Sequence, residues 1–450
     1  FYSKLTNVSA GIYDQAGKLV KRIYKKDFED RSMGEFEVVD TRFITYDVNR
    51  RSYPYTLYYE YSKNLSGLKY LPRWTPITRT LQSLQTGKLT VRVPKDLDIR
   101  HLELGGIGEP TIVESDEKLA YTWTLEGQTP LKYESYAPHT PLPTVLLATT
   151  EIEFGGYKGS AKSWQEFGLF HYNLNEDRYQ VSSEMSERVK ELTANAHNTY
   201  EKVNALYKYV QENTRYMSIQ LGIGGFQSMR AQEVERTGYG DCKALTYLMK
   251  GMLEELEIPS YACLIYRGRK PRPLHTDFVS TQFNHVLLCV PHAGDTIWVE
   301  CTQDGVPAGY LSTDDNDRYV LLLSEEGGHL LRTPTPSPND NQQVRIANVK
   351  LAPDGSAVAH VNTRLTGFQQ DYVRYMTTHK DQREKESWLQ NRLNLSSVEI
   401  TKLSIQKEEN RPECNLDYQL SARNWAKKSG NRLFLKLHQL ESPTSVPTKY

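Results

Sequence analysis

The sequence has no excess of charge of either sign, since Lys plus Arg and Asp plus Glu each total 55 of the 450 residues. Proteins that bind nucleic acid or an anionic membrane surface usually carry a basic excess, so this balance argues against both partners. The chain also lacks any apolar run near the roughly 18 residues that a membrane-spanning helix needs. We therefore expect no nucleic-acid partner and no transmembrane segment.

Cysteine is scarce as well: there are five, and no two of them stand in a Cys-x-x-Cys spacing. The odd number argues against a disulfide framework, and the spacing argues against a zinc site built on thiolates. We expect neither a metal nor a cofactor. Cys263, Cys289 and Cys301 lie in apolar runs, which predicts core residues. Cys242 has different surroundings.

Tyrosine is abundant, with 30 residues, and many runs alternate Thr, Val or Tyr with polar residues. Such alternation is typical of β-strands. It recurs through the first part of the chain, for example at residues 55–61 and 119–125, and turn residues separate the runs. We predict an N-terminal β-sandwich domain over residues 1–182, uninterrupted by a helix.

Helical spacing dominates the next part of the chain. After Thr199, apolar residues recur at intervals of three and four, which predicts a helix. A second helix is predicted by the continuous apolar stripe that follows Asp241 and ends before Pro259. Three strands are expected after these two helices, at residues 261–266, 284–290 and 296–302. Helices and strands together predict an α+β domain over residues 183–332.

Residues 333–342, TPTPSPNDNQ, have the composition of a linker. A β-rich C-terminal domain is expected over residues 343–450, with a hairpin turn at Pro353–Gly355 and a helical stretch near 369–393. The chain starts with Phe rather than Met, which we interpret as removal of an upstream segment, either a cleaved export signal or a truncation. The tail at 442–450 follows a strand-like run without a closing element, so we expect this domain to be incomplete.

The segment Gly238–Lys243, GYGDCK, carries the strongest chemical signal. Asp241 is a good helix N-cap, which places Cys242 in the first helical turn. Free backbone N–H groups and the positive end of the helix dipole favour a thiolate there. The alternative interpretation is a small buried residue that happens to begin a helix.

A histidine and a carboxylate lie on the next predicted hairpin. If its loop is the four residues 291–294, then His285 lies directly opposite Glu300. Cross-strand partners share one face with Cβ atoms about 5 Å apart, so the carboxylate could orient the imidazole. A slip of one residue would move Glu300 to the other face, and a surface hairpin with an isolated histidine is the alternative.

These elements supply a nucleophile, a base and an orienting acid in the chain order Cys, His, acid. The motifs GDCK at 240–243, FNH at 283–285 and WVECT at 298–302 resemble those of the transglutaminase-like superfamily. That resemblance covers about residues 183–330 and implies a papain-like core. The flanks resemble the β-domains that accompany this core in exported proteins of Gram-negative bacteria. Fold class α+β is thus expected, with a papain/transglutaminase-like core between an N-terminal β-sandwich and a C-terminal β-rich domain.

The resemblance implies that Cys242 is the nucleophile, His285 the general base and acid, and Glu300 the orienting carboxylate. The sequence departs from the family pattern in two places, with Glu300 where Asp is usual and Ala244 where an acidic residue is frequent. Gln227 or Gln220, on the glycine-rich loop before the site, could donate an amide to an oxyanion. Solvated loop glutamines are the alternative.

Two further groups are considered on composition alone. Arg267 and Arg269 lie in a basic loop that could select anionic substrates or a C-terminal carboxylate, or could be simply solvated. The segment Asp314–Asp317 lacks the Gly and the distal Glu of a calcium loop, so we expect it at the surface.

The sequence therefore predicts an exported periplasmic or envelope protein that hydrolyses a peptide or protein amide through a cysteine acyl-enzyme. Transamidation by the same acyl-enzyme is the second reading, because only the acceptor differs. A catalytically silent binding or scaffold protein of the envelope is the rival from another class.

Overall fold

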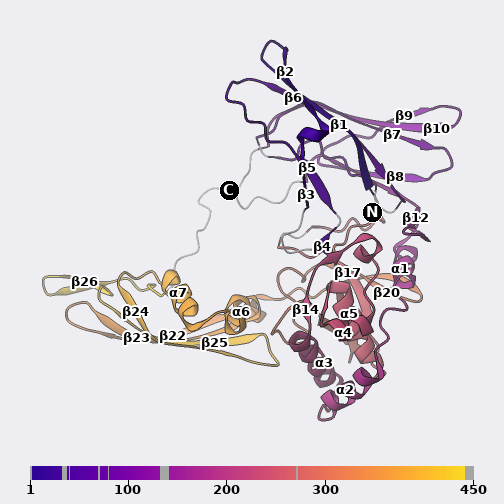
Figure 1. Ribbon diagram of the computed structural model, residues 1–450. Helices are drawn as coiled ribbons and strands as arrows, with labels where there is room; N and C mark the ends of the chain where they lie inside the picture. Colours follow the sequence, from indigo (N-terminus) through magenta and orange to yellow (C-terminus); the bar gives the residue numbers. More distant parts are fainter. Residues whose placement is uncertain are drawn as a thin grey trace.

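The computed structural model describes residues 3–32, 38–39, 41–68, 71–79, 81–131, 141–269 and 272–440. It has an N-terminal β-rich region, an α+β core and a C-terminal β-sheet region, which confirms the predicted fold class at this level (Figure 1). In Figure 1 the N-terminal strands lie above the core and the C-terminal sheet extends to its left. The exact domain boundaries stay predictions, and the tail at 442–450 lies outside the described residues.

The N-terminal region is built from small antiparallel sheets, in the orders β2-β1-β6, β7-β10-β9 and β11-β8, with the pairs β3-β5 and β12-β13. Its central strands are half-buried, as expected of alternating sequences. The strands are β1 (Ser3–Tyr13), β2 (Leu19–Tyr24), β3 (Glu29–Ser32), β4 (Val38–Val39), β5 (Arg42–Thr45), β6 (Thr56–Leu65), β7 (Leu84–Pro94), β8 (Ile99–Leu104), β9 (Thr111–Glu114), β10 (Lys118–Gln128), β11 (Thr144–Thr149), β12 (Glu151–Phe154) and β13 (Tyr157–Ser160).

One helix lies inside the range that was predicted to contain strands alone. Helix α1 (Trp164–Asn173) begins behind the N-cap Ser163 and packs on the core sheet. A Cβ at Gly168 would lie 2.2 Å from the Cα of Gly328, so the glycine permits this close approach. The prediction was wrong because aromatic residues and Gly168 have weak helix propensity, and packing on the sheet outweighs it.

The core contains a five-stranded antiparallel sheet in the order β19-β18-β17-β20-β21. Helix α5 follows its N-cap Asp241 and ends before Pro259, as predicted, and it covers one face of the sheet. The core elements are α2 (Ser183–Thr193), α3 (Thr199–Asn213), β14 (Arg215–Tyr216), β15 (Ile219–Gln220), α4 (Ala231–Thr237), β16 (Tyr239–Gly240), α5 (Cys242–Glu254), β17 (Tyr261–Ile265), β18 (His285–His292), β19 (Asp295–Val299), β20 (Tyr319–Ser324) and β21 (Gly327–Arg332).

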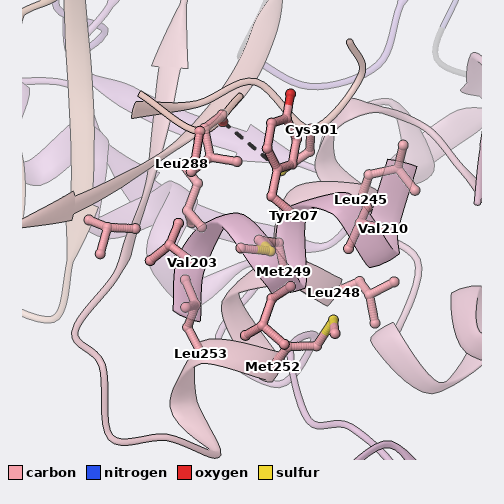
Figure 2. Packing of buried hydrophobic residues seen from close by; sticks show 14 of the residues in the cluster. Val203, Tyr207, Val210, Leu245, Leu248, Met249, Met252, Leu253, Leu288 and Cys301 are labelled. Atoms are coloured by element: carbon pink, nitrogen blue, oxygen red, sulfur yellow. Dashed lines mark hydrogen bonds between the residues drawn. The ribbon is translucent and has the colours of Figure 1, made fainter. Parts of the chain in front are cut away.

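The largest hydrophobic cluster packs α3 and α5 against strands β18 and β19. Figure 2 shows Met249 and Met252 of α5, Val203 of α3 and Leu288 of the sheet within this cluster. The predicted apolar faces of both helices are thus confirmed. Burying several Leu, Met and Val side chains stabilises by about 1.5–3 kcal/mol each, which fixes the start of α5 against the sheet.

The C-terminal region is a four-stranded antiparallel sheet, β22-β23-β25-β24, with two helices on one face. Alternate residues of β23 are buried and exposed, so only one face is covered. The predicted hairpin is confirmed, whereas the single helical stretch at 369–393 is two helices. The elements are β22 (Gln343–Leu351), β23 (Ala357–Thr366), α6 (Asp371–His379), α7 (Gln382–Arg392), β24 (Val398–Lys407), β25 (Glu413–Ala422), β26 (Ala426–Ser429) and β27 (Arg432–Leu435).

Across the parts of the chain that the structure describes, no helix combines the length and the hydrophobicity that crossing a membrane requires.

Candidate functional site

The first turn of α5 holds the predicted nucleophile. Asp241 caps the helix, with its Oδ1 accepting the backbone N–H of Ala244 at 3.0 Å. Cys242 is the first helical residue and is 6% exposed. Its backbone N–H has no carbonyl one turn earlier in the helix to accept it. The other oxygen of Asp241 pairs with Lys243 and accepts the amide of Gln220 at 3.3 Å.

Two glycines let the chain reach this position. Gly238 has φ +68°, the left-handed conformation that ends α4. A Cβ at Gly240 would lie 2.7 Å from the Cβ of Ala244, so the chain passes directly over the helix start. Ala244 is fully buried under this segment. An acidic residue, frequent at that position in the family pattern, would bring a carboxylate into this buried place.

The hairpin that carries His285 has a register different from the predicted one. The turn is only Ala293–Gly294, with both φ values positive, as a type I′ turn requires. Val290 therefore pairs with Ile297, two residues from the expected Asp295. Continuing this register places Glu300 beside Leu287 rather than opposite His285. A shift of two residues keeps the face of a strand, so Glu300 remains on the side of His285.

The two side chains meet at the end of the sheet. Nε2 of His285 lies 2.6 Å from Oε2 of Glu300, and the two side chains are 7% and 0% exposed. Cys242 lines the same cavity as His285, and its thiol raises the pKa of the imidazole. Because Glu300 holds Nε2, the nitrogen left for the thiol is Nδ1. A thiol, an imidazole and a carboxylate thus form one buried chain of contacts.

Glu300 is held on its far side by a second set of contacts. Its Oε1 accepts the backbone N–H of Thr302 at 2.9 Å and the Thr302 hydroxyl at 2.5 Å. Arg267 donates to that hydroxyl at 2.7 Å and lies 3.7 Å from the carboxylate. Tyr207 of α3 fixes the backbone by donating to the Glu300 carbonyl at 2.6 Å. These contacts determine where the carboxylate lies.

A further carboxylate, Asp315, lies behind Arg267 at 3.4 Å and is fully buried. The prediction that residues 314–317 form surface was wrong for this residue, because the Arg267 guanidinium compensates its charge inside the core. Arg267 was predicted as a substrate-binding candidate, yet the structure uses it to bridge Glu300 and Asp315. The composition of the loop gave no signal for this, since the three residues meet only through the fold.

Charge interactions shift the proton equilibria of this cluster. Burial alone would lower the pKa of His285, but the Glu300 carboxylate and the Cys242 thiol outweigh it and raise the pKa to about 10. Burial alone would raise the pKa of Glu300, but His285 and Arg267 lower it to about 2. Burial, together with the nearby Glu300, raises the pKa of Asp315 to about 6. A protonated imidazole between a carboxylate and a thiol is therefore favoured at neutral pH.

Cys242 and His285 line a cavity of about 210 Å³, here called the thiol cavity. Gln220 lines it as well, next to the helix start, while Gln227 does not. The Gln227 amide donates instead to the Leu174 carbonyl at 3.0 Å and the Tyr157 hydroxyl at 3.1 Å. Of the two candidate oxyanion donors, only Gln220 lines the thiol cavity, and its amide donates to Asp241 at 3.3 Å. The remaining wall is mostly apolar and includes Phe167, Phe226, Leu264, Phe283 and Val286.

Arg269 is exposed in the loop after β17 and lines neither this cavity nor the contacts above. Cys263, Cys289 and Cys301 are buried core residues, as predicted. Cys301 packs in the cluster under α5, beside Tyr207 (Figure 2), on the face opposite Glu300. Cys242 is thus the one of these four thiols that lines the thiol cavity.

Two groups of side chains in the described residues have metal-ligand atoms within 4.8 Å of one another. One is His285, Glu300 and Asp315, where Arg267 already supplies a positive charge to both carboxylates. The other is His101, Glu103 and Glu109 in the N-terminal region, where Glu103 is engaged by His101 and by the Trp123 indole. Internal hydrogen bonds and ion pairs engage all three side chains of the first group, and His101 and Glu103 of the second.

The family model of the transglutaminase-like superfamily matches residues 186–314. A crystal structure of a protein described as a putative protease from Parabacteroides distasonis superposes with a TM-score of 0.53 at 15% identity, covering 94% of this chain and 83% of that one. A protein described as a putative cysteine protease from Cytophaga hutchinsonii gives a TM-score of 0.24 at 13% identity, covering 53% and 74% of the two chains, which carries no argument. None of the curated proteins matches significantly. The core is a transglutaminase-like superfamily core with flanking β regions.

Proposed function

We propose, from the premise that residues 186–314 form a transglutaminase-like core, that this protein is a cysteine hydrolase of peptide or protein amides. Cys242 is the nucleophile, His285 the general acid and base, and Glu300 the orienting carboxylate. The observation that carries the proposal is the buried 2.6 Å contact between His285 and Glu300, with the Cys242 thiol on the same imidazole. We extend the proposal to an exported setting on the resemblance of the flanks alone.

In the proposed reaction the Cys242 thiolate attacks the carbonyl carbon of the amide, and the carbonyl electron pair moves onto oxygen. The backbone N–H of Cys242 and the amide of Gln220 are the donors near this oxyanion. Protonated His285 gives its proton to the leaving amine as the C–N bond breaks, which leaves a thioester on Cys242. Neutral His285 then takes a proton from water, whose oxygen attacks the thioester. The C–S bond breaks, and the acid product and the thiolate are released.

Glu300 contributes by orientation and by charge. Because its carboxylate lies on Nε2, the imidazole presents Nδ1 to the thiol and stays protonated next to a thiolate. The contacts of Thr302 and Arg267 with the carboxylate fix the Glu300 side chain in one place, which compensates for its being one methylene longer than Asp. Burial in a low dielectric strengthens each of these interactions.

The test is the rate of Cys242 alkylation by iodoacetamide at pH 6, mapped by mass spectrometry, in the native protein and in Cys242→Ala and His285→Ala variants. A free thiol is almost wholly protonated at that pH, so rapid labelling that depends on His285 supports the proposal. Labelling no faster than that of a free thiol, or unaffected by His285→Ala, would overturn it. An assay of casein hydrolysis in the presence of a dansylated amine then shows whether water or an amine accepts the acyl group. We expect hydrolysis without amine incorporation.

A further inference from the structure

A second cavity, of about 190 Å³, lies where the N-terminal region meets the core. Leu71 and Arg73 of the N-terminal region form one wall, and Arg272 belongs to the core loop on the other side. Phe167 and Thr281 line both this cavity and the thiol cavity, so the two cavities adjoin. We call it the arginine cavity. Its position next to the thiol cavity makes it a place for a part of the substrate beyond the reacting amide.

The charge of the arginine cavity is one-sided. Arg73 and Arg272 are its only charged lining residues among those the structure describes, and no Asp or Glu lines it. Both arginines are exposed, and no carboxylate in the described part of the chain pairs with either; Arg272 stacks at 5.6 Å over the ring of Tyr266. In a chain with equal numbers of acidic and basic residues, such an unpaired cluster attracts an anion.

An unused donor lies at the same place. The Oγ1 of Thr281, where the two cavities adjoin, is buried and has no hydrogen-bond partner within the described ranges. Beneath the cavity, Arg100 donates to the carbonyls of Thr149 at 3.1 Å and Val279 at 2.9 Å, which ties the N-terminal region to the core. Its Nε atom is buried and also lacks a partner there. Arg100 does not line the cavity, whereas Thr281 does. Leaving a buried donor unsatisfied is costly, and a ligand carbonyl or carboxylate that accepts from Thr281 would remove that cost.

We propose that the arginine cavity binds a carboxylate of the substrate, so that the protein selects acidic peptides whose neighbouring residues are aliphatic. The aliphatic preference follows from Leu68, Leu71, Leu146 and Ile152, which form the apolar part of the wall. This inference rests on the proposed function for the position of the scissile amide. Two regions of the chain supply the residues that would select the carboxylate, because Arg73 comes from the N-terminal region and Arg272 from the core.

The experiment measures retention of peptides on immobilised Cys242→Ala protein. One pool contains N-acetylated pentapeptide amides with Glu in the centre and Ala or Leu at the four remaining positions. A matched pool has Gln in the centre and is otherwise the same. We expect the Glu pool to be retained about tenfold more at low salt, with the preference shrinking at high salt because the pairs are solvent-accessible. Arg73→Gln or Arg272→Gln should reduce the preference to about twofold or less.

Arg92→Gln is the matched control, because Arg92 is exposed on β7 and lines neither cavity. Equal retention of the two pools, no retention of either pool, or a preference that survives both arginine substitutions would overturn the inference. The immobilised variant lacks the thiol, so retention does not depend on its reactivity. A failure of the proposed function would appear separately, as slow alkylation of Cys242 in the native protein.

Discussion

Two histidine–carboxylate pairs in this molecule have nearly the same contact distance and very different surroundings. In the core, His285 lies 2.6 Å from Glu300, with side chains 7% and 0% exposed. In the C-terminal sheet, His360 lies 2.9 Å from Asp417, with side chains 49% and 32% exposed. His285 begins β18 and Glu300 directly follows the neighbouring β19, while His360 and Asp417 lie on the paired strands β23 and β25. The core imidazole has a thiol on its other side, whereas His360 stands on the exposed face of β23.

The difference shows that burial and a third partner, rather than the contact itself, make a candidate site. At the surface, water and salt screen the pair, and such pairs contribute about 0–1 kcal/mol. In the core the lower dielectric strengthens the attraction, and Thr302 and Arg267 hold the carboxylate from behind. Only the core pair can therefore keep a protonated imidazole next to a thiol.

The largest expected effect separates the two histidines. We expect His285→Ala to lower the alkylation rate of Cys242 and amide hydrolysis by about 10²–10⁴-fold, because the proton donor and acceptor is lost. His360→Ala should leave both rates unchanged. Equal losses in the two variants, measured on proteins with matching circular dichroism spectra, would contradict the comparison.

The carboxylates should differ in the same direction. Glu300→Gln removes the charge that keeps His285 protonated, so hydrolysis should fall on the order of 10²-fold. Asp417→Asn serves as the surface counterpart and should have no effect on turnover. A Glu300→Asp variant tests the carboxylate length, and we expect it to retain more activity than Glu300→Gln. If Glu300→Gln turned over at the native rate, Glu300 would have no orienting role.

Arginine pairs extend the comparison to stability. Arg267→Gln leaves Glu300 and Asp315 buried without their cation, and we expect the free energy of unfolding to drop by about 2 kcal/mol, allowing for the partial exposure of Arg267. Arg364 pairs with Glu413 at the surface of the C-terminal sheet, and Arg364→Gln should lower the free energy of unfolding less than Arg267→Gln does. Urea unfolding of both variants measures the two values. A larger loss for Arg364→Gln would reverse the expected order.

The smallest effect is a pH dependence of stability. The pKa of His285 is raised to about 10 in the folded protein, so its contribution is complete below the ordinary pKa of about 6.5 and is lost as pH rises towards 10. The pKa of Glu300 is lowered to about 2, so its contribution is present above about 4.3 and is lost as pH falls towards 2. The stability difference between native protein and Glu300→Gln should therefore be largest near pH 5–6 and shrink by pH 10.

Urea midpoints of the two proteins at pH 5.5, 7.5 and 9.5 measure that difference. Asp417→Asn is again the matched control, because the side chains of His360 and Asp417 are 49% and 32% exposed. A Glu300→Gln difference that stays constant over this range would mean that the ion pair with His285 does not form.

The sequence by itself determined the local structure around the site. The spacing of apolar residues gave α3, α5 and their buried faces, and Asp241 fixed the first residue of α5 at Cys242 because a capping carboxylate stabilises that start. Alternation with a period of two placed Glu300 on the side of His285 even though the predicted register was off by two residues. Cys301 fell on the opposite face for the same reason.

Only the tertiary structure decided the rest. The turn at Ala293–Gly294 set the register because its positive φ values match the twist of the paired strands. Packing on the sheet made α1 a helix against its weak propensity. Arg267, Asp315 and Glu300 meet only through the fold, and the arginine cavity joins residues about 200 positions apart, Arg73 and Arg272. Such contacts depend on how separate segments pack, and no periodicity within one segment contains that information.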